Sequence, residues 1–148
     1  MDVIEGLRTI EDLSADIVLC DPPYGIGKDF GNSKDDLKLP EYIEWSKLWI
    51  NESIRILKHT GSIYIYGFSE ILAHLSVNIN LSKRWLIWHY TNKTVPTYTS
   101  GWQRSHESII WVYKGNPIFN VDKVRVPYTD TFLKNSAGKK RTQSDTAR

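Results

Sequence analysis

Residues 14–27 have the sequence SADIVLCDPPYGIG, in which an apolar run is followed by two prolines and two glycines. The apolar run within residues 16–20 has strand length and no helical periodicity, so we expect a buried β-strand there. The strand must end at the proline pair, residues 22–23, because proline has no N–H to donate to a sheet ladder. The glycine-rich residues that follow predict a loop over residues 24–40, beyond the carboxyl end of the strand.

Helices and strands are predicted to alternate along the remainder of the first 115 residues. Residues 2–13 carry apolar side chains at threefold spacing, which indicates a short amphipathic helix or helical turn. The later elements are expected in this order: a helix from Pro40 to about Lys58 that ends at Thr60-Gly61, a strand at Ser62–Tyr66, a short helix with Ser69 as its N-cap, and strands at Trp85–Tyr90 and Ser108–Tyr113. This alternation predicts an α/β fold, a parallel sheet with helices on its faces.

Apolar side chains inside these elements are expected to form the core. The long helix should cover the sheet with one apolar face, made of Tyr42, Ile43, Trp45, Trp49, Ile50, Ile54, Ile56 and Leu57. Aromatic residues within regular elements normally pack, so we expect a core position for Trp45, Trp49, Trp85 and Trp111. The single cysteine, Cys20, is predicted to pack as a small apolar residue, and it does not favour thiol or metal chemistry.

The Asp-Pro-Pro-Tyr sequence at residues 21–24 is the strongest candidate for chemistry. Ligands of open α/β sheets bind outside the carboxyl ends of the strands, where Asp21 falls. An exocyclic amine of a nucleobase is a poor nucleophile because its lone pair is delocalised into the ring, and two acceptors aimed at its N–H bonds would draw that lone pair out of conjugation. The Asp21 carboxylate can supply one acceptor and the Pro22 carbonyl the other, while Pro23 stiffens the unit. Tyr24 offers a ring on which an extruded base can stack.

Residues 14–27 resemble the catalytic motif of the DNA adenine-N6 and cytosine-N4 methyltransferases, and especially of their beta class. Further segments resemble the family in its own order and spacing, so that the resemblance covers about residues 12–118; they are residues 57–67, residues 88–93, residues 104–110 and residues 113–115. The resemblance implies a partial doubly wound, Rossmann-like sheet, S-adenosylmethionine as cofactor and double-stranded DNA as substrate. It implies further that a flipped base reacts at Asp21, Pro22, Pro23 and Tyr24, with Asp21 and Pro22 also touching the cofactor.

The position of the motif within the chain discriminates between classes of this family. Only 20 residues precede Asp21, too few for a complete cofactor-binding half, whereas beta-class enzymes place their catalytic motifs first. The glycine-rich Phe-x-Gly-x-Gly segment that holds the methionine part of the cofactor in this family has no counterpart in the 148 residues. We therefore expect the cofactor-binding half to come from another polypeptide, or the chain to be a truncated product, and the sequence leaves both alternatives open.

Candidate nucleic-acid contacts lie in the loops and near the carboxyl terminus. Phe30 is placed to cover the flipped base or the cofactor, and Lys93 resembles a family lysine near the substrate entrance. Stacking, amide and guanidinium contacts to DNA are expected from Trp102, Gln103 and Arg104, and phosphate contacts from Lys139, Lys140 and Arg141. His106 and Glu107 resemble a family motif, and we expect them to be structural.

The charge distribution divides the chain. Up to Tyr113 there are 11 basic and 14 acidic residues, a net charge of −3, and after it 8 basic and 3 acidic residues, a net charge of +5. We predict a catalytic subdomain at residues 1–115 and, at residues 116–148, a basic segment that begins the target-recognition region and is disordered from Asn135 onwards. No apolar run reaches the roughly 20 residues of a membrane span, and no secretory signal is recognisable, so we expect a cytoplasmic protein.

Two other functions remain open on the sequence alone. Aspartate before Pro-Pro-Tyr favours adenine, yet cytosine N4 is the alternative target. A protein of another class, a catalytically silent DNA-binding or regulatory subunit, would retain the fold without a cofactor half. Association with a complementary subunit or with itself is expected in either case, because strands that lack their neighbours leave apolar surface exposed.

Overall fold

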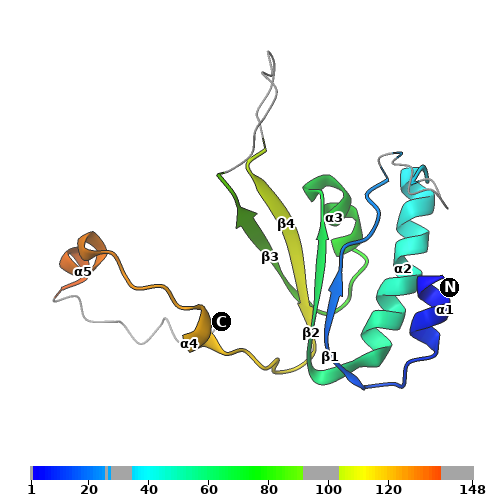
Figure 1. Ribbon diagram of the computed structural model, residues 1–148, viewed down its shortest axis with the longest axis horizontal. Coiled ribbons are helices and arrows are strands. Elements are labelled where there is room, and N and C mark those ends of the chain that lie inside the picture. Colours follow the sequence, from blue (N-terminus) through cyan, green and yellow to red (C-terminus); the bar gives the residue numbers. More distant parts are fainter. Residues whose placement is uncertain (1, 26, 28–34, 92–103, 138–148) are drawn as a thin grey trace, which may run out of the picture. The chain divides into compact units, whose positions relative to one another are not determined.

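The computed structural model describes residues 2–25, 27, 35–91 and 104–137 (Figure 1). It divides into two compact units, Met1–Ile118 and Phe119–Arg148, which are treated separately. The elements of the first unit are α1 (Val3–Arg8), β1 (Ala15–Cys20), α2 (Leu39–Ile56), β2 (Leu57–Gly67), α3 (Ser69–Ser76), β3 (Ser82–His89) and β4 (His106–Tyr113). The second unit contains α4 (Val121–Val124) and α5 (Asp130–Ser136).

The sheet has four strands in the order β1-β2-β4-β3. β1 and β2 are parallel, but β4 is antiparallel to both of its neighbours, so the predicted all-parallel sheet is wrong. β1, β2 and β3 share one direction, as the alternation predicted. β4 follows β3 through residues 90–105 and returns against it, which is the pairing that a direct connection permits, and it separates β3 from β2. The fold is therefore α/β with a mixed sheet, and β1 and β3 are its edge strands.

The long helix ends earlier than predicted, and its end is held by the side chain of the residue that follows β4. Lys114 Nζ donates to the carbonyl oxygens of Ile54 at 2.6 Å and Leu57 at 2.9 Å, so that a cation meets the helix carboxyl terminus. β2 begins directly at Leu57, and the predicted helix stop at residues 60–61 lies inside this strand, where the register with β1 shifts.

The cap predicted for the short helix is also wrong. Phe68 is the N-cap of α3 and Ser69 is its first residue. The Ser69 hydroxyl lies 2.8 Å from the Ser108 hydroxyl, so it joins the helix to β4 instead of capping the helix.

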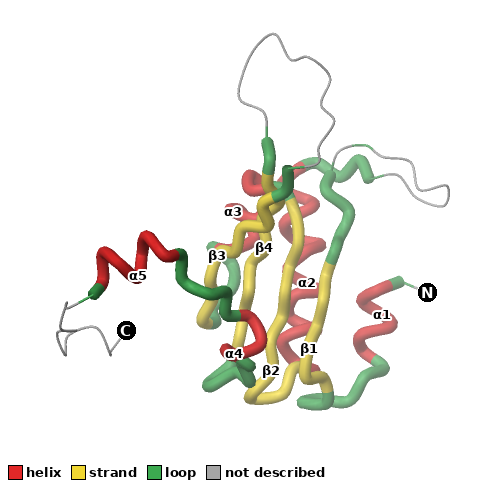
Figure 2. The backbone as a smooth tube through the Cα atoms, turned by 60° about the vertical axis from the view of Figure 1, so that its left-hand side comes forward, coloured by secondary structure: helices red, strands yellow, loops and turns green. Residues whose placement is uncertain are grey.

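The core lies between one face of the sheet and the helices α2 and α3, which lie on the same side of it in Figure 2. The predicted apolar face of α2 is confirmed: Tyr42, Trp49, Ile50 and Ile56 are buried, and Ile43, Trp45 and Ile54 pack against them. They meet buried sheet residues, namely Ile63, Ile65, Ile110 and Val112. The prediction that Trp85 packs in the core is wrong, because 41% of this residue is exposed on the edge strand β3.

The opposite face of the sheet has no helix of the first unit over it, and we call it the open face. Because side chains alternate along a strand, the residues next to the buried ones point there: Ile17, Leu19, Tyr64, Tyr66, Trp88, Ile109 and Trp111. Leu19 is 76% exposed and Ile17 61% exposed. Trp111, predicted to be a core residue, is half-buried on this face, where its Nε1 donates to Ser62 Oγ at 3.0 Å.

The second unit carries two short helices, and the apolar residues Val126 and Tyr128 between them are exposed. α5 reaches Ser136, so the start of the segment predicted to be disordered is helical. The division into a catalytic subdomain at residues 1–115 and a target-recognition segment at residues 116–148 stays a prediction. None of the helices in the described ranges combines the length and the apolar character that crossing a bilayer requires.

Candidate active site

Asp21 follows the last residue of β1 and is exposed at the carboxyl end of that strand. Two cavities meet at this residue, one of about 510 Å³ and one of about 400 Å³, and Asp21, Cys20 and Leu19 line both. The carboxylate therefore stands between two hollows in the surface, which is the location that the sequence predicted for the chemistry.

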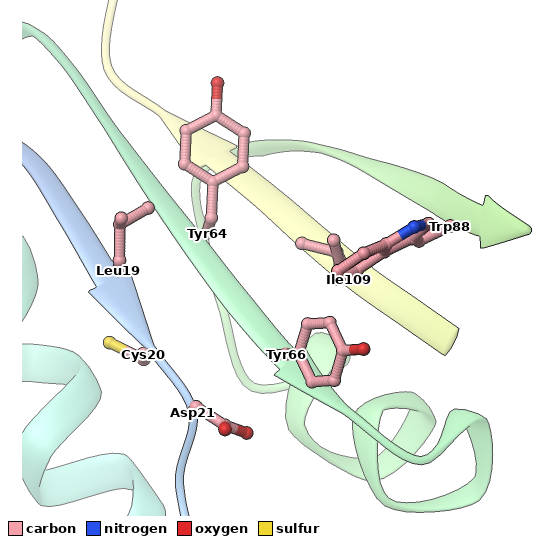
Figure 3. A pocket seen from close by; sticks show the side chains of 7 residues that line it. All are labelled: Leu19, Cys20, Asp21, Tyr64, Tyr66, Trp88 and Ile109. Atoms are coloured by element: carbon pink, nitrogen blue, oxygen red, sulfur yellow. The ribbon is translucent and has the colours of Figure 1, made fainter. Parts of the chain in front are cut away.

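The larger cavity lies on the open face (Figure 3). Besides the residues that both cavities share, it is lined by Tyr64, Tyr66, Trp88 and Ile109, which come from β2, β3 and β4. The Tyr66 and Trp88 rings meet edge to face, with centroids 6.0 Å apart. A mostly apolar, aromatic-walled cavity with a carboxylate at its rim fits a planar ring that carries a hydrogen-bond donor.

The smaller cavity opens between the end of β1 and the helices α1 and α2. Its wall is formed by Val3, Pro22, Pro23, Trp45 and Trp49. The two tryptophan rings lie 6.2 Å apart between centroids. A cavity with aromatic walls and an adjacent carboxylate suits a ligand that combines a flat ring with positive charge.

Tyr24 is tied to Asp21 and to an aromatic neighbour. Its hydroxyl donates to Asp21 Oδ1 at 2.5 Å, and its ring lies 4.7 Å from the Phe68 ring. Burial, together with the hydrogen bond and the charge of Asp21, raises the pKa of the Tyr24 phenol, so the hydroxyl keeps its proton. The Arg104 guanidinium carbon lies 4.1 Å from the centroid of the Phe68 ring. Phe68 thus links the motif tyrosine to an arginine from the segment before β4.

The structure brings together some of the predicted site residues. Asp21, Pro22, Pro23 and Tyr24 form one site, and Arg104 reaches it through Phe68. The other predicted contacts lie outside the described residues: Phe30, Lys93, Trp102, Gln103, Lys139, Lys140 and Arg141. Glu107, at the start of β4, accepts a hydrogen bond from the Tyr90 hydroxyl at 3.1 Å.

Sequence reasoning missed several residues of the site. Tyr64 and Tyr66 alternate with the core residues Ile63 and Ile65, and that alternation alone could have assigned both tyrosines to one face. Phe68 was expected to follow the aromatic strand at residues 62–66, but nothing in the sequence indicated that its ring would contact Tyr24. Cys20 packs against the core as predicted, and burial raises the pKa of its thiol to about 11, which keeps the sulfur protonated near neutral pH.

Two further residues hold the backbone of the motif. The Asp35 carboxylate accepts hydrogen bonds from the Tyr24 N–H at 2.9 Å and from the Gly25 N–H at 2.8 Å. The Tyr42 hydroxyl donates to the Pro23 carbonyl oxygen at 2.6 Å. Nothing in the sequence around these two residues marked them as part of the site.

Comparison with known proteins shows the family of the chain. The family model described as DNA methylase, N6/N4 type, matches residues 15–146. The chain belongs to this family. It is 32% identical over 133 residues to the type II methyltransferase M.HpaI of Haemophilus parainfluenzae, covering 85% of this chain and 42% of the relative. It is 29% identical over 130 residues to the DNA adenine methyltransferase YhdJ of Escherichia coli strain K12, covering 84% of this chain and 44% of that relative.

Solved structures show the same fold. The cytosine-N4-specific PvuII DNA methyltransferase superposes with a TM-score of 0.68 at 15% identity, over 92% of this chain and 60% of that one. The M1.HpyAVI–SAM complex superposes with a TM-score of 0.52 at 15% identity, over 80% of this chain and 54% of that one. The chain thus spans about two fifths of the length of the curated relatives named above.

Proposed function

We propose that this chain is the catalytic half of an S-adenosylmethionine-dependent DNA methyltransferase that modifies adenine at N6. The observation that carries the proposal is the Asp21 carboxylate at the end of β1, exposed at the rim of an aromatic-lined cavity large enough for a nucleobase. Membership of the DNA methylase family supports it. Action on DNA also favours a cytoplasmic location.

Asp21 and Pro22 activate the amino group by orienting it. The carboxylate and the Pro22 carbonyl oxygen each accept a hydrogen bond from one N–H of the exocyclic amine, which takes the nitrogen lone pair out of conjugation with the ring. The negative carboxylate also stabilises the positive charge that develops on nitrogen as the new N–C bond forms. S-adenosylmethionine, when bound, would supply the methyl group: its S–CH3 bond would break with both electrons kept by sulfur, which leaves S-adenosylhomocysteine, and the methylated amine would release one proton to solvent. No covalent link to the protein is required, and the protonated Cys20 takes no part.

The residues around Asp21 suit the two ligands. We assign the larger cavity, with Tyr66 and Trp88, to the flipped base. Tyr24, whose hydroxyl donates to the Asp21 carboxylate beside that cavity, is proposed to stack on the base. The smaller cavity, with Trp45 and Trp49, suits the cationic and aromatic parts of S-adenosylmethionine beside the same carboxylate. Arg104 is assigned to DNA as a phosphate or base contact.

Adenine is preferred over cytosine for two reasons. Aspartate precedes Pro-Pro-Tyr in this chain, and a relative that matches over most of the chain is named as a DNA adenine methyltransferase. Cytosine N4 is the second candidate, because aspartate before Pro-Pro-Tyr only leans toward adenine. The likeness to the cytosine-N4-specific PvuII enzyme, at 15% identity, concerns the fold alone.

The cofactor-binding half is proposed to come from a region or polypeptide beyond these 148 residues. The chain spans only part of its relatives, β1 is an edge strand, and the open face carries Ile17 and Leu19 largely exposed. In the complete enzyme, a further strand would pair with the edge of β1, and further structure would cover the open face. We call the chain together with such a polypeptide the reconstituted enzyme.

Product analysis tests the proposed function. The reconstituted enzyme, given unmethylated genomic DNA and S-adenosylmethionine labelled in the methyl group, should place the label in N6-methyladenine after digestion to nucleosides and chromatography. Label in N4-methylcytosine would instead establish the second candidate. DNA binding without label in any nucleoside would favour the catalytically silent DNA-binding protein.

Variants of Tyr24 test its stacking role. Tyr24→Ala should reduce the fluorescence rise of 2-aminopurine at the target position by about tenfold, because base–aromatic stacking contributes roughly 1–3 kcal/mol. Tyr24→Phe keeps the ring and should retain most of the signal. Affinity for DNA measured by anisotropy should change little in both variants, since phosphate contacts come from other residues. Equal loss of the flipping signal in the two variants would contradict the stacking role.

A further inference from the structure

We propose that Asp35, together with Tyr42, is a positioning residue that fixes the main chain of the Asp-Pro-Pro-Tyr motif from outside the reaction site. This inference rests on the proposed function, because it explains how the two acceptors for the target amine keep their directions. Neither Asp35 nor Tyr42 lines either cavity, so any effect on the reaction passes through the backbone.

Asp35 is held by main-chain donors of the motif. Its side chain accepts from the Tyr24 N–H through Oδ2 and from the Gly25 N–H through both oxygens, at 2.8 and 2.9 Å, while its own carbonyl accepts from the Gly27 N–H at 2.5 Å. Gly25 and Gly27 have φ angles of +69° and +72°, a conformation that suits glycine and turns successive N–H groups towards one side. The segment after the prolines thus wraps around one aspartate.

The burial of Asp35 shows that this contact is built into the fold. Only 7% of the residue is exposed. A carboxylate is costly to bury unless hydrogen bonds replace its water, and charge-assisted bonds from N–H groups are among the stronger ones available. Its neighbour Asp36 is exposed, so of these two adjacent aspartates Asp35 is the buried one.

Tyr42 fixes the same segment from the helix. It is 2% exposed in the first turns of α2, and its hydroxyl donates to the Pro23 carbonyl. Burial raises the pKa of the Tyr42 phenol to about 12, so the donor proton stays in place. α2 packs against the sheet with Trp49 and Ile50, which makes it a rigid support.

Together these bonds fix the peptide groups that follow the catalytic pair. The Pro23 carbonyl and the N–H groups of Tyr24 and Gly25 are held, and the proline rings restrict φ at residues 22 and 23. The direction of the Pro22 carbonyl then follows from its neighbours. The proposed role of Asp35 is to hold this acceptor, and the Tyr24 ring next to it, in the geometry that the target amine requires.

Amide hydrogen exchange on the 148-residue chain tests the contact without any need for activity. Asp35→Asn keeps the size of the side chain but replaces one acceptor oxygen with a donor, so exchange at the Tyr24 and Gly25 amides should accelerate about tenfold or more. Asp36→Asn is the matched control and should leave both amides unchanged. Unchanged exchange in Asp35→Asn, with a native spectrum elsewhere, would overturn the proposal. If Asp35→Asn does not fold, Tyr42→Phe supplies the same comparison at the Pro23–Tyr24 peptide.

Kinetics of the reconstituted enzyme separate positioning from a general structural role. Asp35→Asn should lower kcat about tenfold or more while KM for DNA stays within about twofold, and Asp35→Glu, which keeps two acceptor oxygens, should recover part of kcat. A rise of KM alone would contradict positioning. Accelerated exchange in Asp35→Asn combined with no methyl transfer by the wild type would leave the contact established and count against the proposed function instead.

Discussion

Asp21→Ala should lower the rate of methyl transfer by the reconstituted enzyme at least about a hundredfold, because single preorganised electrostatic groups commonly contribute 10²–10³ in rate. The change removes one of the two acceptors for the target amine. Asp21 is exposed at the end of β1, so its loss opens no cavity in the core, and the hydrogen bond that it loses is the one from the Tyr24 hydroxyl. The melting temperature should therefore stay close to that of the wild type. Initial rates with methyl-labelled S-adenosylmethionine provide the measurement.

Two companion variants make the Asp21 result interpretable. Asp21→Asn keeps the shape but can accept through one oxygen only, and it should remain well below the wild type. Asp16→Asn is the matched control, since Asp16 lies on the same strand and pairs at the surface with Lys58 at 2.8 Å. It should keep nearly full activity, because exposed ion pairs contribute little. More than about a tenth of wild-type activity in Asp21→Ala would count strongly against the assigned role.

The chain on its own should bind S-adenosylmethionine weakly or not at all, and it should self-associate or capture a complementary polypeptide. The reason is that the helices described in the first unit lie on one face of the sheet, so that within this unit the open face and the edge of β1 present apolar side chains and main-chain groups available for pairing. Isothermal titration with the cofactor and light scattering on the same sample measure the two properties. A pure monomer that bound the cofactor tightly and methylated DNA unaided would show that the chain is more than a catalytic half.

A charge on the open face should disrupt that association. Ile17→Lys places an ammonium group on the edge strand where a partner would pack, and it should weaken association about tenfold or more, since a buried isoleucine contributes roughly 1.5–3 kcal/mol. Val77→Lys is the matched control, because Val77 is 76% exposed at the C-cap of α3, away from β1. Equal weakening by both variants would point to a nonspecific effect of charge.

The local sequence was sufficient to place the Asp-Pro-Pro-Tyr motif at the end of a strand. The apolar run before Asp21 forms β1 as predicted, and the apolar stripe of α2 forms the core as predicted. Both features depend on short-range rules: proline ends a ladder, and helical periodicity creates a face. The family resemblance stated from the same residues is confirmed by the DNA methylase match.

Features that depend on distant partners were not predictable in this way. The direction of β4 is set by its pairing with β2 and β3, and the exposure of Trp85 follows from the edge position that results. The end of α2 is set by Lys114, 60 residues beyond Ile54. Asp35 looks like any acidic loop residue until the fold brings the Tyr24 and Gly25 amides to it. Each of these features is decided by contacts between residues far apart in the sequence, and neither hydrophobic periodicity nor residue propensity predicts such contacts.

The edge position of β1 has a consequence for how the activity could be controlled in the cell. β1, which ends at the proposed catalytic carboxylate of Asp21, is hydrogen-bonded to β2, and under the proposed function a second polypeptide would join at its other edge. When two separately made polypeptides meet at such an edge, mass action governs how much of each is assembled. In dilute conditions the rate of DNA modification would then follow the product of their two concentrations, so doubling the synthesis of both would raise it about fourfold.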